Sequence, residues 1–204
     1  MLIAFAAAAL ALLQPGAQCA AAGRSIDQDR AGLNVRARPS PQGRILGRLH
    51  SVLDPEEQHL RAGRRYGPVF AIREVRNGWV RITGAASESE GADGEVRRNY
   101  TGQGWIAASM VEPSIVSLRN GDPGSRGYAG PSFGAAVSDP DALTNVEQMI
   151  RRGRHPRLVA CRGAFVQLDY VRSGRLSPAG RWVHFAPGEE VPARAWFRSG
   201  NPGE

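Results

Sequence analysis

The chain has 204 residues, of which 42% are hydrophobic, and a formal net charge of +7. This length allows one or two modest domains. All 26 basic residues are arginine, which fits either a coding bias or the binding of anions by guanidinium groups. No Gly-rich phosphate loop follows a predicted strand, and neither the histidines nor the cysteines have metal-ligand spacing, so we expect no cofactor and no metal.

The N-terminal segment has the pattern of a secretory signal peptide. Residues 2–13 form a nearly unbroken apolar run, which Pro15-Gly16 and a series of small residues follow. The run is shorter than the roughly 20 residues needed to cross a bilayer, so we expect no stable membrane span. We predict a signal peptide over residues 1–22, cleaved after Ala20 or Ala22, and a periplasmic or secreted protein.

The two cysteines lie far apart in the sequence. Cys19 falls within the predicted signal, and the residues before it, Gly16-Ala17-Gln18, do not resemble a lipobox. Removal of the signal would leave Cys161 as the only cysteine of the mature chain, without an intramolecular disulfide. Because Cys161 ends the apolar run 158–161, we predict a buried structural thiol there.

A strand and a turn open the first predicted domain. Leu33 and Val35 face one side of the extended strand, and Asn34 and Arg36 face the other. The Pro- and Gly-containing residues 39–43 then form a turn. We expect Asn34 and Arg36 to fix the loop beside this strand, with a ligand contact as the minority interpretation.

A hairpin follows in the middle of this domain. Strands over 69–75 and 79–83 flank Asn77-Gly78, and Asn-Gly is a strong signal for a two-residue hairpin turn. Val80 and Ile82 are predicted to point inward, and the residues that alternate with them point outward.

The remaining parts of the first domain are two loops and its final strands. Residues 51–67 are predicted to form a long loop with a short helical turn at 56–61, and residues 84–102 a flexible hairpin extension without apolar periodicity. Strands are predicted from residue 104 and over 110–112, with a short helical turn at 107–109 between them.

These motifs together resemble a bacterial SH3 (SH3b) domain, a module of exported and cell-wall proteins. The motifs that carry the resemblance are Leu33-Asn34-Val35-Arg36 with Pro39, Ile45-Leu46-Gly47, Asn77-Gly78-Trp79-Val80-Arg81-Ile82 and Gly104-Trp105-Ile106, in this order. The resemblance covers residues 26–113 and implies a small, strongly bent β-barrel that binds and does not catalyse.

The second half is predicted to be a divergent SH3-like domain over 139–198, with 114–138 as a linker or the start of the repeat and 199–204 as a tail. Three segments echo the first half: Val116-Ser117-Leu118-Arg119, Gly163-Ala164-Phe165-Val166-Gln167-Leu168 and Gly180-Arg181-Trp182-Val183. The predicted strands are 157–161, 165–171, 181–185 and 191–197. The expected fold class is therefore all-β, with an inserted helix in the second domain.

The inserted helix has both start and stop signals. Asp139-Pro140-Asp141 offers an N-cap, a proline at the first helical position and an acid in the first turn, and Gly153 ends the helix. Four apolar residues recur on one face: Leu143, Val146, Met149 and Ile150. We expect this face to pack on the second domain rather than on a partner.

Four aromatic residues that a small barrel cannot fully bury are the candidate ligand-binding residues: Tyr66, Trp79, Tyr100 and Trp105. Tryptophan and tyrosine on a rim stack well on sugars or peptides. A role in the core is the alternative for each tryptophan. The arginine-rich segment 151–181 could meet anionic glycan, phospholipid or nucleic acid, or could simply be solvated; export argues against nucleic acid.

The expected function is that of an exported, non-catalytic module that binds peptidoglycan or an envelope protein. One alternative is a protein-interaction module that recruits or regulates an envelope enzyme. Another is a hydrolase built on Cys161, because residues 161–166 faintly resemble the cysteine-containing helix start of NlpC/P60 peptidases. Arg162 stands where that family usually has a serine, and the remaining chain is too short for the histidine-bearing strands, so we predict no enzyme.

Overall fold

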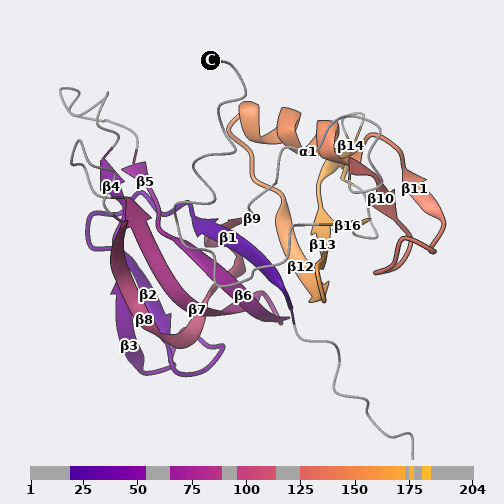
Figure 1. Ribbon diagram of the computed structural model, residues 1–204. Coiled ribbons are helices and arrows are strands. Elements are labelled where there is room, and N and C mark those ends of the chain that lie inside the picture. The colour runs from indigo at the N-terminus through magenta and orange to yellow at the C-terminus, as the bar shows by residue number, and fades with distance from the viewer. Residues whose placement is uncertain are drawn as a thin grey trace, which may run out of the picture.

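The structure, a computed structural model, describes residues 19–53, 65–88, 96–113, 125–172, 175–176 and 181–184. This part of the chain is mostly β, with two main antiparallel sheets and one α-helix, so the predicted all-β class is confirmed (Figure 1). Several predicted features lie outside the described residues: the apolar run at 2–13, the helical turn at 56–61, the first echo at 116–119, the strand at 191–197 and the tail at 199–204.

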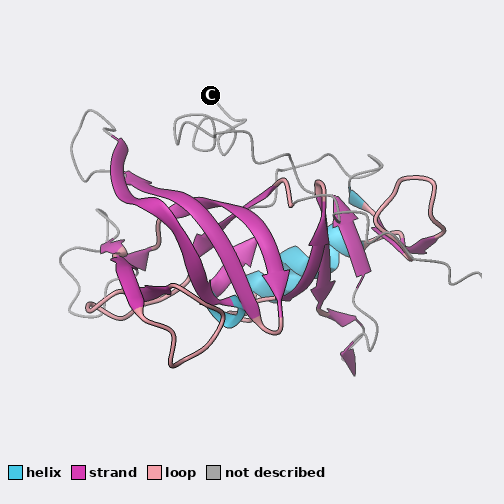
Figure 2. Ribbon diagram, turned by 90° about the horizontal axis from the view of Figure 1, so that it is seen from below, coloured by secondary structure: helices cyan, strands magenta, loops and turns pink. Residues whose placement is uncertain are grey.

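The larger sheet has seven strands in the order β3-β2-β8-β7-β6-β1-β9. Their bounds are β1 (Ala21–Ser25), β2 (Leu33–Arg36), β3 (Ile45–Leu49), β6 (Val69–Arg76), β7 (Trp79–Glu88), β8 (Val96–Ala107) and β9 (Val111–Pro113). The short strands β4 (Val52–Leu53) and β5 (Arg65–Tyr66) pair with each other. The long strands of this sheet are strongly curved (Figure 2).

The central hairpin forms as predicted. The Arg76–Trp79 pair closes a two-residue turn in which Asn77 has φ 51° and Gly78 has φ 77°. Both central residues of a type I′ turn need this left-handed conformation, which Asn and Gly tolerate best. Val80 and Ile82 are fully buried, which confirms the predicted inward face. A 3-10 helix, Ala108–Met110, confirms the short helical turn before the final strand.

The hairpin extension predicted over 84–102 is present in the described residues, but as a regular two-stranded ladder instead of an irregular segment. Strands β7 and β8 continue their ladder beyond the central hairpin, with Ala85 opposite Tyr100 and Ala86 opposite Arg98. Two register shifts near Ala85 interrupt the strict alternation of faces. Small and polar residues in such a ladder carry no apolar periodicity, and for that reason the sequence pattern concealed these strands.

The first strand lies earlier than the predicted start of the domain at residue 26. Strand β1 is internal to the sheet, where Ala21 pairs with Ile72 of β6 and Arg24 pairs with Glu112 of β9. Ala21 and Ala22 are almost completely buried. Strand β1 is buried on both faces of the sheet, where small side chains fit, and small side chains are also what a signal cleavage region contains.

The smaller sheet has five strands in the order β11-β10-β16-β13-β12. Their bounds are β10 (Gly127–Tyr128), β11 (Val137–Asp139), β12 (Arg157–Arg162), β13 (Phe165–Asp169) and β16 (Arg181–His184). A separate ladder joins β14 (Val171–Arg172) and β15 (Arg175–Leu176). The strands predicted from residues 157, 165 and 181 are thus confirmed; β12 ends one residue later than predicted, β13 ends two residues earlier, and the predicted end of the third strand at 185 lies outside the described residues.

The helix α1 (Ala142–Arg151) confirms the predicted element but begins later than expected. Asp139 is the last residue of β11 rather than the N-cap, and its Oδ1 accepts a hydrogen bond from the Asp141 backbone N–H at 3.2 Å. Leu143 and Val146 are buried, as predicted for the apolar face. Gly153, with φ 69°, follows the end of the helix.

The two sheets share one strand order. Five neighbouring strands of the larger sheet have the order β3-β2-β8-β7-β6, and the smaller sheet has the order β11-β10-β16-β13-β12. When the strands of each set are numbered by their position along the chain, the two orders are the same. The register also shifts at the same point of the first hairpin, between Val35 and Arg36 in one sheet and between Gly127 and Tyr128 in the other. The strand that corresponds to β2 is therefore β10.

The turn after β2 recurs 92 residues later, bond for bond. Ala37 N–H donates to Arg44 O at 2.9 Å, and Ala129 N–H (129 − 37 = 92) donates to Ala136 O at 2.9 Å. The other matched backbone bonds are Ser40 N–H to Arg38 O with Ser132 N–H to Gly130 O, and Gly43 N–H to Ser40 O with Ala135 N–H to Ser132 O. We interpret the second sheet as a repeat of the first, in agreement with the predicted echoes at 163–168 and 180–183.

Candidate ligand-binding faces

The outward side of the larger sheet carries two of the predicted aromatic residues. Trp79 lies opposite Ala107, and Arg81 lies opposite Trp105, which also lies opposite Arg36 of β2. Residues directly opposite in an antiparallel ladder share a face. We call the set of outward residues Arg36, Arg76, Trp79, Arg81 and Trp105 the first face.

The first face is aromatic and positively charged. The Arg76 guanidinium lies 5.1 Å from the centroid of the Trp105 ring, a cation–π contact that helps to leave Trp105 only 6% exposed. Glu74 lies beside Arg81, with 3.5 Å between Arg81 Nε and Glu74 Oε2. The guanidinium groups of Arg76 and Arg81 thus flank the Glu74 carboxylate, and Trp79 is partly exposed beside them.

Arg36 and Asn34 fix local structure, as predicted. Arg36 Nη1 donates to the Gly43 carbonyl at 2.9 Å, across the turn that follows β2. Asn34 Oδ1 accepts from Arg48 Nε of the neighbouring strand at 3.1 Å. Arg36 therefore both holds the turn and contributes positive charge to the first face.

Of the other two predicted aromatic residues, Tyr100 does not join Trp79 and Trp105. Tyr100 lies opposite the buried Ala85 and packs against the core, and its hydroxyl donates to Gln103 O at 3.1 Å. Burial raises the pKa of Tyr100 above its ordinary value. Tyr66 contributes its backbone to β5, and its side chain lies outside the described part of the structure.

The smaller sheet presents a corresponding face that the sequence did not single out. Phe165 lies opposite His184, and Gln167 lies opposite Trp182, which in turn lies opposite Tyr128 of β10. We call these five residues the second face. In the matched register, Phe165 takes the place of Trp79, Gln167 that of Arg81, Trp182 that of Trp105 and Tyr128 that of Arg36.

The second face is a cluster of rings. Phe133, from the turn between β10 and β11, lies with its ring centroid 4.8 Å from that of His184 and 5.1 Å from that of Phe165. Its edge contact with Tyr128 has a centroid distance of 5.7 Å. Phe133 is nevertheless 51% exposed. Partial burial in this cluster lowers the pKa of His184 below its ordinary value.

One sequence signal could have located the second face. Pro131-Ser132 repeats Pro39-Ser40 at the spacing of the matched turns, which would have placed Phe133 beside the echoed strands. The sequence pattern at 116–119 was instead matched to the first strand, although the match at Pro131-Ser132 is better. The signal was missed because a Pro-Ser pair alone is a common turn dipeptide.

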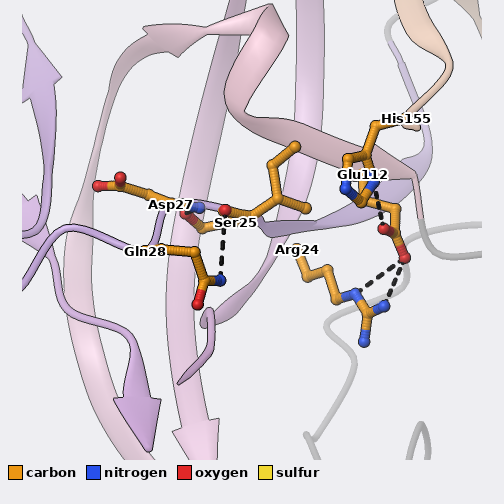
Figure 3. Close-up of polar contacts among 7 residues, drawn as sticks. Arg24, Ser25, Asp27, Gln28, Glu112 and His155 are labelled. Atoms are coloured by element: carbon orange, nitrogen blue, oxygen red, sulfur yellow. Dashed lines mark hydrogen bonds and ion pairs between the residues drawn. The ribbon is translucent and has the colours of Figure 1, made fainter. Parts of the chain in front are cut away.

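A buried carboxylate joins the two halves of the molecule (Figure 3). Glu112 of β9 accepts hydrogen bonds on Oε1 from Arg24 Nε at 3.0 Å and Arg24 Nη2 at 2.5 Å. His155, from the segment between α1 and β12, places Nδ1 2.7 Å from Glu112 Oε2. The Glu112 side chain is only 7% exposed, so the Arg24 guanidinium compensates a buried charge.

The prediction of a free thiol at Cys161 is wrong. Cys161 and Cys19 form a disulfide, with 5.5 Å between their Cα atoms, and no cysteine in the described residues is free. Cys161 lies on β12 and Cys19 directly precedes β1, so the bond joins the two sheets. The prediction failed because Cys19 was assigned to the removed signal.

The arginine-rich segment is mostly solvated where the structure describes it. Arg151, Arg152 and Arg154 are exposed. Arg157 is paired with Asp169 across β12 and β13, with 3.1 Å between Nε and Oδ2. By register, Arg157 and Arg162 lie on the outward side of the smaller sheet, opposite Asp169 and Phe165 respectively.

Comparison with protein-family models, curated proteins and solved structures found no match to this chain. Among the described residues, no group of three or more histidine, cysteine or acidic side chains could hold a metal ion. No helix in this part of the chain is long and apolar enough to cross a membrane. The two faces and the order of the motifs are therefore the basis for a functional conclusion.

Proposed function

We propose that this protein is an exported, non-catalytic binding module of the SH3b type, and that it recognises peptidoglycan or another cell-envelope ligand through the first face. The observation that carries the proposal is the partly exposed Trp79 ring beside the guanidinium groups of Arg76 and Arg81 on one sheet face. The confirmed Asn77-Gly78 turn and the 3-10 helix at Ala108–Met110, both in the expected order, support the resemblance.

The first face suits a ligand that combines carboxylates with apolar or sugar rings. Guanidinium groups bind carboxylates through two parallel hydrogen bonds, and the faces of tryptophan rings stack on the C–H groups of sugars. Peptidoglycan offers both chemistries, with carboxylates on its stem peptides and rings along its glycan. Glu74 opposes an anionic ligand, but it is outnumbered by the arginines around it.

The non-catalytic part of the proposal is supported by Cys161. A cysteine hydrolase requires a free thiolate beside a positioned imidazole. The Cys161 sulfur is bonded to that of Cys19, which leaves no nucleophile at this position. A hydrolase of the NlpC/P60 type is thus the least supported alternative.

A protein-interaction module that recruits or regulates an envelope enzyme is the second candidate. It is favoured by the exposed Phe133 ring that packs against the second face, because aromatic residues are enriched in protein interfaces. On this alternative, the second face rather than the first would determine binding.

Retention on purified sacculi tests the proposal. Trp79→Ala and Arg81→Ala should each weaken retention by about tenfold, the equivalent of about 1.4 kcal/mol, and retention of the wild type should fall as salt rises. Arg44→Ala is the matched control, since Arg44 is an exposed arginine in the turn after β2 and should bind normally. Absence of wild-type retention at low and moderate salt would exclude wall binding, and a single crosslinked protein partner would then favour the second candidate.

A further inference from the structure

We infer that the N-terminal leader is removed upstream of Cys19, and that the Cys19–Cys161 disulfide then locks β1 between the two halves of the mature protein. This inference rests on the proposed export, since it concerns where the exported chain is cut and how it is oxidised. It replaces cleavage after Ala20 or Ala22 with cleavage that retains Cys19.

The residues just before β1 belong to the folded protein. Cys19 is 3% exposed, and its backbone N–H donates to Arg73 O of β6 at 3.2 Å. The Ala20 N–H donates to the carbonyl of Gly163 at 2.8 Å, in the turn between β12 and β13. Cys19 and Ala20 thus bridge the larger sheet to the smaller one through backbone bonds as well as through the disulfide.

Cleavage at either predicted position would remove part of this bridge. A cut after Ala20 deletes Cys19 and leaves the Cys161 thiol without its partner. A cut after Ala22 also deletes Ala21 and Ala22, which are buried in the sheet and pair with Ile72 and Ala71 of β6. The backbone groups of β6 that pair with Ala21 and Ala22 would then lose their hydrogen-bonded neighbour, which weakens this part of the sheet.

The rest of β1 is held at the same boundary. Its pairing with both β6 and β9 places Arg24 beside Glu112, where His155 of the second half also lies. The disulfide and this ion cluster therefore secure the two ends of one five-residue strand. A strand fixed at both ends is poorly suited to be the remnant of a processed leader.

The oxidation fits an exported chain. The two thiols lose two protons and two electrons as the S–S bond forms, and a disulfide-bearing thiol oxidoreductase of the export compartment accepts them and becomes a dithiol. Such bonds persist in oxidising compartments and are rare in the cytosol.

Peptide mapping of the exported protein tests the inference. The full chain, with its own leader and a C-terminal tag, is expressed in a bacterium with an oxidising periplasm, and free thiols are alkylated under denaturing conditions without reductant. The expected periplasmic product begins at or before Cys19, carries no alkyl group and yields one peptide that joins Cys19 to Cys161. A periplasmic product that begins after Cys19, with Cys161 alkylated, overturns the inference while leaving export intact. A cytoplasmic product with an uncut leader overturns the proposed export itself, and the inference with it.

Limited proteolysis adds a readout that does not depend on the leader. In Cys161→Ser, trypsin should cut after Arg24 or Arg30 several-fold faster than in the oxidised wild type, because β1 opens more readily without its bond. Reductant should produce the same acceleration in the wild type and none in Cys161→Ser. Equal cutting rates for oxidised and reduced wild type would overturn the locking of β1.

Discussion

Trp105 and Trp182 occupy the same register position in two sheets, but their surroundings differ in charge. The residues opposite Trp105 are Arg81 and Arg36, whereas those opposite Trp182 are Gln167 and Tyr128. The backbone frame is therefore constant, and around this tryptophan the two arginines of the first sheet are replaced by a glutamine and a tyrosine in the second. A binding preference at each face should follow these substitutions.

His184 gives the second face a dependence on pH. Burial lowers its pKa, so the unfolded chain binds a proton more readily than the folded protein. The stabilising contribution of neutral His184 is therefore complete above the ordinary histidine pKa of about 6.5 and is lost as pH falls below it. In urea unfolding between about pH 8 and about pH 5, His184→Phe should show a weaker loss of stability with acidification than the wild type.

Phenylalanine is the informative replacement because it retains the ring contacts with Phe133 and Phe165. The acidic residues contribute equally to the pH dependence of the unfolding free energy in both proteins. The difference between the two slopes against pH therefore reports on His184 alone. Identical slopes for the two proteins would show that His184 does not titrate differently on folding.

At the scale of elements, Asp139 explains why the second hairpin passes directly into α1. Its side chain accepts hydrogen bonds from the Tyr170 hydroxyl at 2.5 Å and from Asn145 Nδ2 at 3.2 Å, besides the Asp141 N–H. The carboxylate is completely buried, so each of these bonds offsets a part of its desolvation. It thereby fixes β11, the first turn of α1 and the segment before β14 together.

Asp139→Ala should destabilise the protein by about 3 kcal/mol, because it strands the buried Tyr170 hydroxyl without this partner. Asp141→Ala is the matched control: Asp141 precedes the helix but is exposed and makes no side-chain capping bond, so its loss should cost less than about 0.5 kcal/mol. Chemical denaturation measures both changes. Similar midpoints for the two variants would contradict the structural role of Asp139.

The elements that could be predicted from the sequence are those set by local chemistry. Asn77-Gly78 selects its turn through backbone conformation, and Val80 and Ile82 reveal their face by alternation. Strand β1 could not be predicted in this way, since its identity depends on pairing with β6 and β9, distant in sequence. Its alanines satisfy a packing constraint that composition alone assigns to a cleavage region.

The candidate site shows the same limit. Trp79 and Trp105 share a face because Arg81 links their two strands by register, which alternation predicts. Tyr100 lies on the opposite face because it stands five residues before Trp105 on β8, and the sequence pattern did not show this because residues 84–102 were not assigned to strands. The disulfide could not be predicted, because Cys19 was assigned to a leader that is absent from the mature protein.

For the whole molecule, the repeat and the N-terminal strand serve different purposes. The repeat supplies two sheets of one topology, each with a single outward face of distinct chemistry. Strand β1 is additional to that repeat: it extends the larger sheet and reaches the smaller one through Cys19. The two faces are thus held in one covalent unit, which would let a single chain engage two features of one extended ligand.

Loss of the disulfide should therefore weaken the whole protein rather than one half. The bond spans a sequence separation of 142 residues, and a closed loop of this length restricts the unfolded chain strongly. The Cys19→Ser/Cys161→Ser variant should lose about 2–5 kcal/mol of unfolding free energy relative to the oxidised wild type, measured by urea denaturation. Reductant should lower the wild-type midpoint toward that of the variant and leave the variant unchanged.

Because the core residues of both sheets form one cluster, the two halves should unfold in a single transition while the bond is intact. An oxidised wild type and a double variant with equal midpoints would show that the contacts of Arg24, Glu112 and His155 hold the halves together without the covalent link.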